Sequence, residues 1–295
     1  MQKKIFLEND QTQDFTNWFE KVINGDISIN YKSEKKLYRS FNEIKDNYSW
    51  PPKDTNLLLP NENITIKKNS SLAANQELLN KLAEGLKEAL YSKSDEELQI
   101  WVKAIFVWGG VFTFTKNRKG NAGWLEHYCF NGGLSDYLSA TFKKINSLQD
   151  DDEVATINDL RSNAGLTKVY ALGCDNFIIY DSRVAAALTW LLAFWAQDSR
   201  LVPDYLRFST MRANTSKKEG KQRTSNEKIF PYFTASGERR NHNKHLLWNI
   251  RANWLLEQTL EKVKLNSGSD YVCSMRDLEA SLFVIGDDLR YAKQY

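Results

Sequence analysis

The sequence has few of the residues from which metal centres, disulfide frameworks and histidine-based active sites are built. Its 295 residues include three cysteines and three histidines. Cys129, Cys174 and Cys273 are odd in number and far apart, so no pair has the spacing of a zinc site or of a disulfide framework. His242 and His245 stand among cations, which repel a metal ion. We expect a reducing environment and no metal or cofactor.

Several familiar catalytic signatures are also missing. The chain has no glycine-rich phosphate loop, no dinucleotide fingerprint, no His-Glu-x-x-His and no serine elbow. These absences argue against the chemistries that depend on those motifs. No apolar run approaches the roughly 18 residues needed to span a membrane, and the stretch Met1–Glu8 becomes polar too soon for a signal peptide. We therefore expect a soluble cytoplasmic protein with no membrane partner.

Apolar residues, by contrast, are plentiful enough for a substantial core. Hydrophobic residues make up 42% of the chain and aromatic residues 13%. Alternating strand patterns are nearly absent, and Ile64–Ile66 is at most one short strand. The pattern favours the mainly α class. We expect a helical core over residues 71–295 with an N-terminal helical arm and linker over residues 1–70, rather than two clear domains.

Helical periodicity covers most of the expected core. Leucines that recur from Leu72 onward predict an amphipathic helix that ends near Tyr91. Ser94 and Glu97 have the spacing of a capping box and open a helix that reaches Trp108. Further helical patterns cover residues 134–145, 157–172, 182–197 and 245–264, and a last helix begins after Ser274.

Positive charge is concentrated in one part of the chain. The formal net charge is +3, but eleven Lys or Arg and three acids lie between Arg207 and Arg251, which gives +8 there and leaves −5 for the remainder. Ser, Thr and Asn are interleaved with these cations, a mixture that contacts phosphates. A solvated loop would explain a short run, whereas so long an excess favours a polyanionic partner. The candidate contacts in this basic insert, about residues 207–245, are Arg212, Lys217, Lys218, Arg223, Arg239 and Arg240.

A glycine-containing loop at residues 117–123 is a second candidate for ligand contact. It is basic, and its glycines allow the backbone to come close to a ligand. Lys119 is the cation singled out here. An ordinary surface turn explains the same pattern, so the loop by itself leaves both interpretations open.

The stretch Phe177–Val184 delivers a single carboxylate, Asp181, to the start of a strongly hydrophobic helix. Asp is a favoured N-cap because its oxygen accepts hydrogen bonds from the first backbone N–H groups of a helix. A carboxylate fixed between apolar neighbours is also a negative charge that can stabilise a cation formed during a reaction. Asp181 alone is therefore compatible with a cap and with a catalytic role.

The residues before Asp181 extend this pattern. Asn163–Val169 places a glycine-containing turn before Lys168, and Asp181 follows that lysine by thirteen residues. This order resembles the helix–hairpin–helix DNA glycosylases, and within them the 8-oxoguanine DNA glycosylase branch and its bacterial relatives, over about Leu160–Leu192. In that superfamily a glycine-rich hairpin grips a DNA phosphate and a later aspartate begins a buried helix. The hairpin here has a single glycine, Gly165, and the lysine-to-aspartate interval is shorter than is usual in the family.

The resemblance implies a role for several residues and a double-stranded DNA partner that contains modified bases. Asp181 takes the position of the catalytic aspartate and Lys168 that of the nucleophilic lysine, with strand cleavage by the lysine left open. Gly165 takes the position of the phosphate-gripping turn. Because such enzymes extrude the target base onto aromatic side chains, the chain's aromatic residues are candidates for a base pocket, although core packing explains any one of them as well. The pocket candidates are Trp108, Phe112, Trp124 and Tyr180, and Arg183 and Lys119 join the candidate DNA contacts.

The resemblance also limits the substrate to a few classes. The bacterial relatives include phage-defence glycosylases that act on hypermodified cytosines, such as glucosylated hydroxymethylcytosine, and repair enzymes for oxidised guanine. The basic insert and the N-terminal arm go beyond a minimal repair enzyme, which favours antiviral defence. A DNA-binding protein of the same fold without catalysis is the alternative from another functional class. We expect no obligate protein partner.

Overall fold

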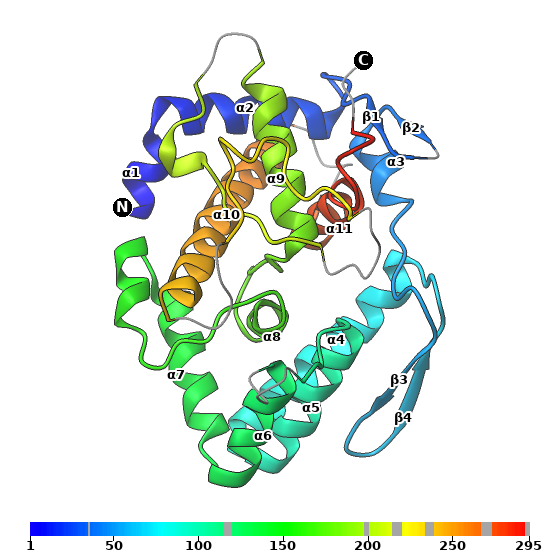
Figure 1. Cartoon of the computed structure of the whole chain (residues 1–295), viewed down its shortest axis with the longest axis vertical. Coiled ribbons are helices and arrows are strands. Elements are labelled where there is room, and N and C mark those ends of the chain that lie inside the picture. Colours follow the sequence, from blue (N-terminus) through cyan, green and yellow to red (C-terminus); the bar gives the residue numbers. More distant parts are fainter. Residues whose placement is uncertain are drawn as a thin grey trace. The chain divides into compact units, whose positions relative to one another are not determined.

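A computed structural model describes residues 1–34, 36–114, 120–197, 201–213, 220–233, 239–266 and 273–292, except for the side chains of Arg239 and Arg240. The chain is mainly helical, as the sequence predicts, and its described part adds two small antiparallel hairpins (Figure 1). It divides into two compact units. Unit 1 comprises residues 1–48, 149–154 and 180–295, and unit 2 comprises residues 49–148 and 155–179.

The N-terminal part of unit 1 is a set of short elements closed by local caps. Asn9 caps the second helix by accepting a hydrogen bond from Gln11 N, and Gly25 ends that helix with a φ of 88°, a conformation that favours glycine. Phe15 and Phe19 are fully buried on its inner face. The elements are α1 (Lys3–Glu8), α2 (Asp10–Asn24), β1 (Tyr31–Lys32), β2 (Leu37–Tyr38) and α3 (Phe41–Lys45).

Three longer helices form the rest of unit 1. α9 (Ser182–Trp195) is buried continuously from Val184 to Leu192 because nearly all its residues are apolar. α11 (Met275–Ile285) packs against α9 and α3, and α10 (Arg239–Asn266) packs against α2 (Figure 1). The short 3-10 helix η2 (Asp204–Leu206) lies between α9 and α10 in sequence. Within the described residues, no helix is both long and apolar enough to cross a membrane.

Unit 2 is a helical cluster with one two-stranded β-hairpin at its N-terminal end. α5 (Asp95–Trp108) is the central helix of the unit, because it packs against α4 (Leu72–Tyr91), α6 (Asn121–Asn131), α7 (Leu134–Ser147) and α8 (Leu166–Gly173). Asp95 caps α7 across the fold by accepting hydrogen bonds from the backbone N–H groups of Gly133, Leu134 and Ser135. The elements are β3 (Thr55–Leu58), β4 (Asn63–Ile66), α4 (Leu72–Tyr91), α5 (Asp95–Trp108), α6 (Asn121–Asn131), α7 (Leu134–Ser147) and α8 (Leu166–Gly173), and the 3-10 helix η1 (Asp151–Thr156) spans a boundary between the units.

Some sequence predictions fail in unit 2 for reasons of tertiary structure. The helix predicted over 157–172 begins only at Leu166, because Tyr137 Oη accepts from Arg161 N and Tyr170 Oη donates to Arg161 O, so tyrosine side chains take the hydrogen bonds that a helix would use. Asn121, which the sequence analysis placed in a loop, begins α6. The single strand expected at 64–66 is one arm of the β3–β4 hairpin.

The division into units also differs from the boundary expected at residue 70. Residues of the N-terminal arm as far as Tyr48 belong to unit 1, together with α9, α10 and α11. Long-range contacts account for this grouping. Lys3 Nζ pairs with Glu257 of α10 at 2.8 Å, and Tyr31 Oη donates to Ile285 O of α11 at 3.1 Å. Such contacts between distant segments leave no periodic signal in the sequence.

Candidate functional site

Asp181 is the N-cap of α9, which confirms the structural role expected from the sequence. Its Oδ1 accepts hydrogen bonds from Arg183 N at 2.9 Å and Val184 N at 3.2 Å. The preceding Tyr180 is fully buried, and its hydroxyl donates to Ser209 O at 2.7 Å. The carboxylate is therefore held between a buried aromatic residue and the first turn of a buried helix.

The first turn of α9 lies directly against the C-terminal end of α11. Gly286 follows α11, and a Cβ at this position would collide with the backbone carbonyl of Arg183. Only glycine permits so close an approach of two backbones. The Arg183 guanidinium lies over the ring of Phe283, 4.1 Å from its centroid. The backbone next to Asp181 is thus fixed by packing as well as by its cap.

An ionic cluster surrounds Asp287 at the same place. Its carboxylate pairs with Arg183 Nη2 at 2.8 Å and with Lys221 Nζ at 2.6 Å, and it lies 3.8 Å from Arg223 Nη2. Burial opposes ionisation of this carboxyl group, but Arg183, Lys221 and Arg223 outweigh burial and hold the pKa of Asp287 below its ordinary value. Three cations therefore share one carboxylate beside the start of α9.

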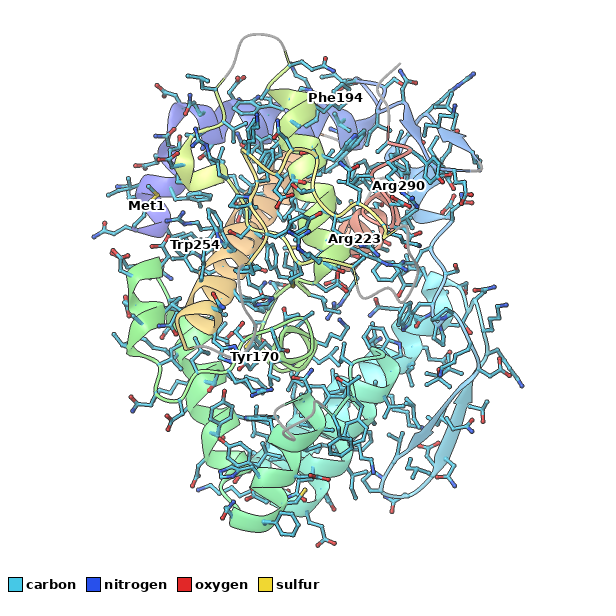
Figure 2. All side chains as sticks on the ribbon, viewed as in Figure 1. Met1, Tyr170, Phe194, Arg223, Trp254 and Arg290 are labelled. Atoms are coloured by element: carbon cyan, nitrogen blue, oxygen red, sulfur yellow. The ribbon has the colours of Figure 1, made fainter. Side chains whose placement is uncertain are left out.

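Arg223, which is labelled in Figure 2, has the least exposed side chain of this cluster. Its side chain is 6% exposed, and its Nη1 donates to Gly286 O. Burial lowers the pKa of Arg223, and the charge of Arg183 lowers it further, whereas the charges of Asp287, Asp181 and Asp288 raise it. The Asp181 carboxylate thus acts electrostatically on Arg223.

Other cations of the basic region also have acidic partners. Arg251 Nε pairs with the buried Asp151 at 2.6 Å. Arg212, whose side chain is 71% exposed, pairs with Glu227 at 3.2 Å and lies over the ring of Tyr232. Asp151 and Asp287, which lie outside the basic region, therefore neutralise part of its excess charge, whereas Glu227 lies within that region. Lys119, Lys217 and Lys218 and the side chains of Arg239 and Arg240 lie outside the described residues, so their contact with DNA stays a prediction.

The turn before α8, residues 163–165, takes the position of the hairpin in the resemblance and keeps that name below. It is held by side-chain amides. Asn163 Oδ1 accepts from Gly165 N at 2.8 Å and from Leu166 N at 3.1 Å, which are the first free donors of α8. Asn163 Nδ2 donates to Asn121 Oδ1 at 3.0 Å, and Asn121 Nδ2 donates to Val111 O at 3.2 Å. Two of the hairpin's backbone donors thus have partners inside unit 2. Neither Asn163 nor Asn121 is among the site residues predicted from the sequence, although an Asn three residues before a helical run is a known turn and cap signal.

Gly165 is needed here because of close packing and not because of a positive φ. Its φ is −84°, which any residue can adopt. A Cβ at Gly165 would overlap the side-chain amide of Asn121. The single glycine of the hairpin therefore makes room for the contact that ties the hairpin to the start of α6.

Lys168 is a buried residue of α8. It is 5% exposed, and its Nζ donates to Ala164 O at 2.8 Å within the hairpin. Its methylene groups lie so close to Gly109 that a Cβ there would overlap them. Lys168 belongs to unit 2 and Asp181 to unit 1, so each is described within its own unit.

The proposed pocket aromatics differ in exposure. Trp108 is 4% exposed and its Nε1 donates to Asn75 Oδ1 at 3.0 Å, so it occupies a core position, and Tyr180 does so in unit 1. Phe112 and Trp124 are half-buried. Phe112 lies edge-on to Phe114, which is 53% exposed. Phe112 and Trp124 are the two candidates with an accessible face.

One group of acids in the described residues has the spacing of a metal site, and it already has a cationic partner. Asp150, Asp151 and Asp152 offer carboxylate oxygens within 4.8 Å of one another. The α-ammonium group of Met1 lies 2.9, 2.6 and 3.3 Å from the three carboxylates. Burial opposes the charge of that group, but hydrogen bonds to these carboxylates raise its pKa to about 10. The three acids therefore bind the chain's own amino group.

These contacts define one candidate site in each unit, and each is described by itself. One is the start of α9, with Asp181 and the cations around Asp287, and the other is the hairpin of unit 2 with Lys168. A search of protein-family models, of curated proteins and of solved structures found no match to the chain.

Proposed function

We propose that this chain is a DNA glycosylase that extrudes a modified base from double-stranded DNA and hydrolyses its glycosidic bond. The observation that carries the proposal is Asp181, a half-buried carboxylate fixed at the start of a buried helix by two backbone hydrogen bonds. The order of Gly165, Lys168 and Asp181 in the chain supports it through the resemblance to the helix–hairpin–helix glycosylases.

The chemistry follows from the charge that develops at the sugar. A base inside a duplex cannot be reached, so it must first be extruded into a pocket and stacked on aromatic side chains. When the glycosidic bond breaks, the sugar becomes an oxocarbenium-like cation. The carboxylate of Asp181 stabilises this cation and orients or deprotonates the water that attacks it. Because its cap hydrogen bonds keep it in place, the carboxylate needs little reorganisation when the cation forms.

Lys168 offers a second step, because a neutral lysine amine is a nucleophile towards the sugar. In that step the amine attacks C1′, the base leaves with the bonding electrons, and a Schiff base with the opened sugar forms before strand cleavage. Borohydride reduction tests this step. A trapped protein–DNA adduct makes Lys168 the nucleophile, whereas base release without an adduct leaves Asp181 and water as the complete machinery.

A hypermodified cytosine of phage DNA, such as a glucosylated one, is the substrate class we propose, and oxidised guanine is the alternative. The basic insert and the N-terminal arm are additional to a minimal repair enzyme, and their residues could enlarge or line a pocket. A non-catalytic DNA-binding role is the competing function. Salt-sensitive DNA binding fits both functions and does not separate them.

The decisive experiment is incubation of the protein with genomic DNA from phages with modified and with unmodified bases. The products to score are released free bases and abasic sites. Release from modified DNA by the wild type, and not by an Asp181→Asn variant, supports the proposal. DNA binding without any base release from the whole panel would support the non-catalytic alternative.

A further inference from the structure

Arg223 is predicted from the sequence to contact DNA, yet it lies inside unit 1. Its side chain is 6% exposed, compared with 71% for Arg212 of the same basic insert. A phosphate could reach its guanidinium only if the turn at Gly286 moved, because Nη1 already donates to Gly286 O. Its surroundings do not suit a contact with DNA.

The contacts of Arg223 lead to the start of α9. Gly286, whose carbonyl accepts from Arg223, packs against the backbone of Arg183 in the first turn of that helix. Arg183 N donates to the Asp181 carboxylate. Arg223 also shares the Asp287 carboxylate with the Arg183 side chain. Arg223 is thus connected to the backbone next to Asp181 in two ways. One is its hydrogen bond to the carbonyl of Gly286, and the other is the Asp287 carboxylate that it shares with Arg183.

The segment that carries Arg223 is hydrogen-bonded to α9. Ser225 N donates to Thr189 Oγ1 at 3.2 Å, and Ser225 Oγ donates to Thr189 O at 2.8 Å. On the other side, Leu289 N donates to Gln222 O at 3.1 Å. These bonds fix the backbone on both sides of Arg223. The guanidinium therefore has a set position relative to the first turn of α9.

Burial of this cation is energetically unfavourable, and its hydrogen bonding is incomplete. Arg223 Nε is buried and makes no hydrogen bond with the described residues. Taking an unpaired donor and a charge out of water costs free energy unless nearby carboxylates compensate. Asp287 and Asp181 are carboxylates whose charges stabilise it. A buried cation that lies 3.8 Å from Asp287 and is stabilised by the charge of the proposed catalytic group has a function beyond filling space.

We propose that Arg223 is a positioning residue for Asp181: its fixed charge and its bond to Gly286 hold the Asp181 carboxylate and the first turn of α9 in their working arrangement. The inference rests on the proposed function of Asp181. Arg223 does not touch DNA. Arg212, which is exposed on the same insert, is the matched residue for phosphate contact.

The kinetic test compares Arg223→Gln, Arg223→Lys and Arg212→Gln on the DNA that the wild type cleaves best. Arg223→Gln keeps a donor for Gly286 but loses the charge, so base release at saturating DNA falls at least about tenfold, as for other residues that support an active-site group. Its DNA affinity and the salt dependence of that affinity stay at the wild-type level. Arg223→Lys restores most of the rate. Arg212→Gln lowers the salt slope by about one unit, as loss of a phosphate contact does.

Three outcomes overturn the inference. The first is a full rate for Arg223→Gln, because the charge is then unnecessary. The second is a reduced salt slope for Arg223→Gln, because Arg223 is then a phosphate contact. The third is a folded Arg223→Lys variant as slow as Arg223→Gln, which would assign the residue a purely steric role. If Arg223→Gln does not fold, the rate of Arg223→Lys decides the matter.

A double-mutant cycle tests the energetic coupling between Arg223 and Asp181 without a measurement of enzymatic activity. Asp181→Asn, Arg223→Gln and the double variant are unfolded by denaturant beside the wild type. We expect the double variant to lose less stability than the sum of the two single variants, because each charge is unfavourable without the other. Additive losses contradict the inference. Absence of base release by the wild type contradicts the proposed function instead, so the two failures are distinguishable.

Discussion

The hairpin of unit 2 and the start of α9 in unit 1 carry the two proposed catalytic groups, and they are stabilised in different ways. The hairpin is stabilised by hydrogen bonds of neutral side-chain amides. Asn163 accepts from the backbone before α8, and its own amide donates to Asn121. At the start of α9, next to Asp181, the charged side chains of Arg183 and Lys221 pair with Asp287. Neutral hydrogen bonds respond little to salt and pH, whereas an ionic cluster responds to both. Experiments can therefore address each region separately.

The largest effect is expected from Asp181→Asn, because it removes the charge and keeps the cap. Asn is as good an N-cap as Asp, so loss of the cap should contribute less than about 1 kcal/mol to the change in the free energy of unfolding, and any further loss reports the coupling to Arg223. The rate of base release should fall by a factor of about 100 to 1,000, the loss typical for one electrostatic group in an active site. Single-turnover release of base and a denaturation curve measure the two effects. An unchanged rate would leave Asp181 as a cap alone.

The glycines of the two regions should respond differently to a methyl group. In Gly286→Ala the new methyl meets the backbone of Arg183, which cannot move without shifting α9, and we expect a loss of about 2 to 3 kcal/mol of stability. In Gly165→Ala the obstacle is the side-chain amide of Asn121, which can rotate, and we expect about 1 kcal/mol. Denaturant unfolding of both variants measures the difference.

The double variant Gly165→Ala with Asn121→Ala is the control for this comparison. It removes the obstacle together with the glycine, so the overlap cost of Gly165→Ala should disappear. Gly286→Ala has no equivalent remedy, because its obstacle is a carbonyl group of the main chain. Equal losses for the two single variants would show that the two regions are equally rigid.

Asn163→Ala sharpens the comparison on the side of the hairpin. The variant loses the acceptor for the first backbone donors of α8 and should cost about 1 kcal/mol, the usual value of an N-cap. Because no charge is lost, the cost should be the same at low and high salt. Thermal unfolding at two salt concentrations measures it. A cost that falls steeply with salt would contradict the description of the hairpin as a neutral network.

The same contrast explains what the sequence could predict. The cap of α9 was predictable because Asp181 and the apolar run that follows it are adjacent in the chain. Asn163 could have been identified by the same local rule. The cluster around Asp287 could not be predicted, because Asp287, Arg183 and the segment with Lys221 and Arg223 are far apart in the chain. For the same reason Arg223 was predicted to lie at the surface. Its acidic partners are far along the chain, so a count of charges within the basic region does not include them.

Asp287→Asn is expected to have a smaller effect on stability that depends on conditions. The folded protein holds the pKa of Asp287 below its ordinary value of 3.8, so ionisation of this group stabilises the fold at neutral pH. That contribution is present above the ordinary value and is lost as the pH falls through the lower, folded value. The side chain is 38% exposed, so solvent screens part of the effect.

The difference in melting temperature between wild type and Asp287→Asn should therefore be largest at neutral pH and low salt. It should shrink as the pH falls below 3.8, because the wild-type carboxyl group is then losing its charge too. Added salt should reduce it as well, since part of the cluster is accessible to solvent. Asn163→Ala is the matched control, with a loss that changes with neither variable. If the two variants showed the same pH and salt profile, the ionic cluster would not be what distinguishes the start of α9 from the hairpin.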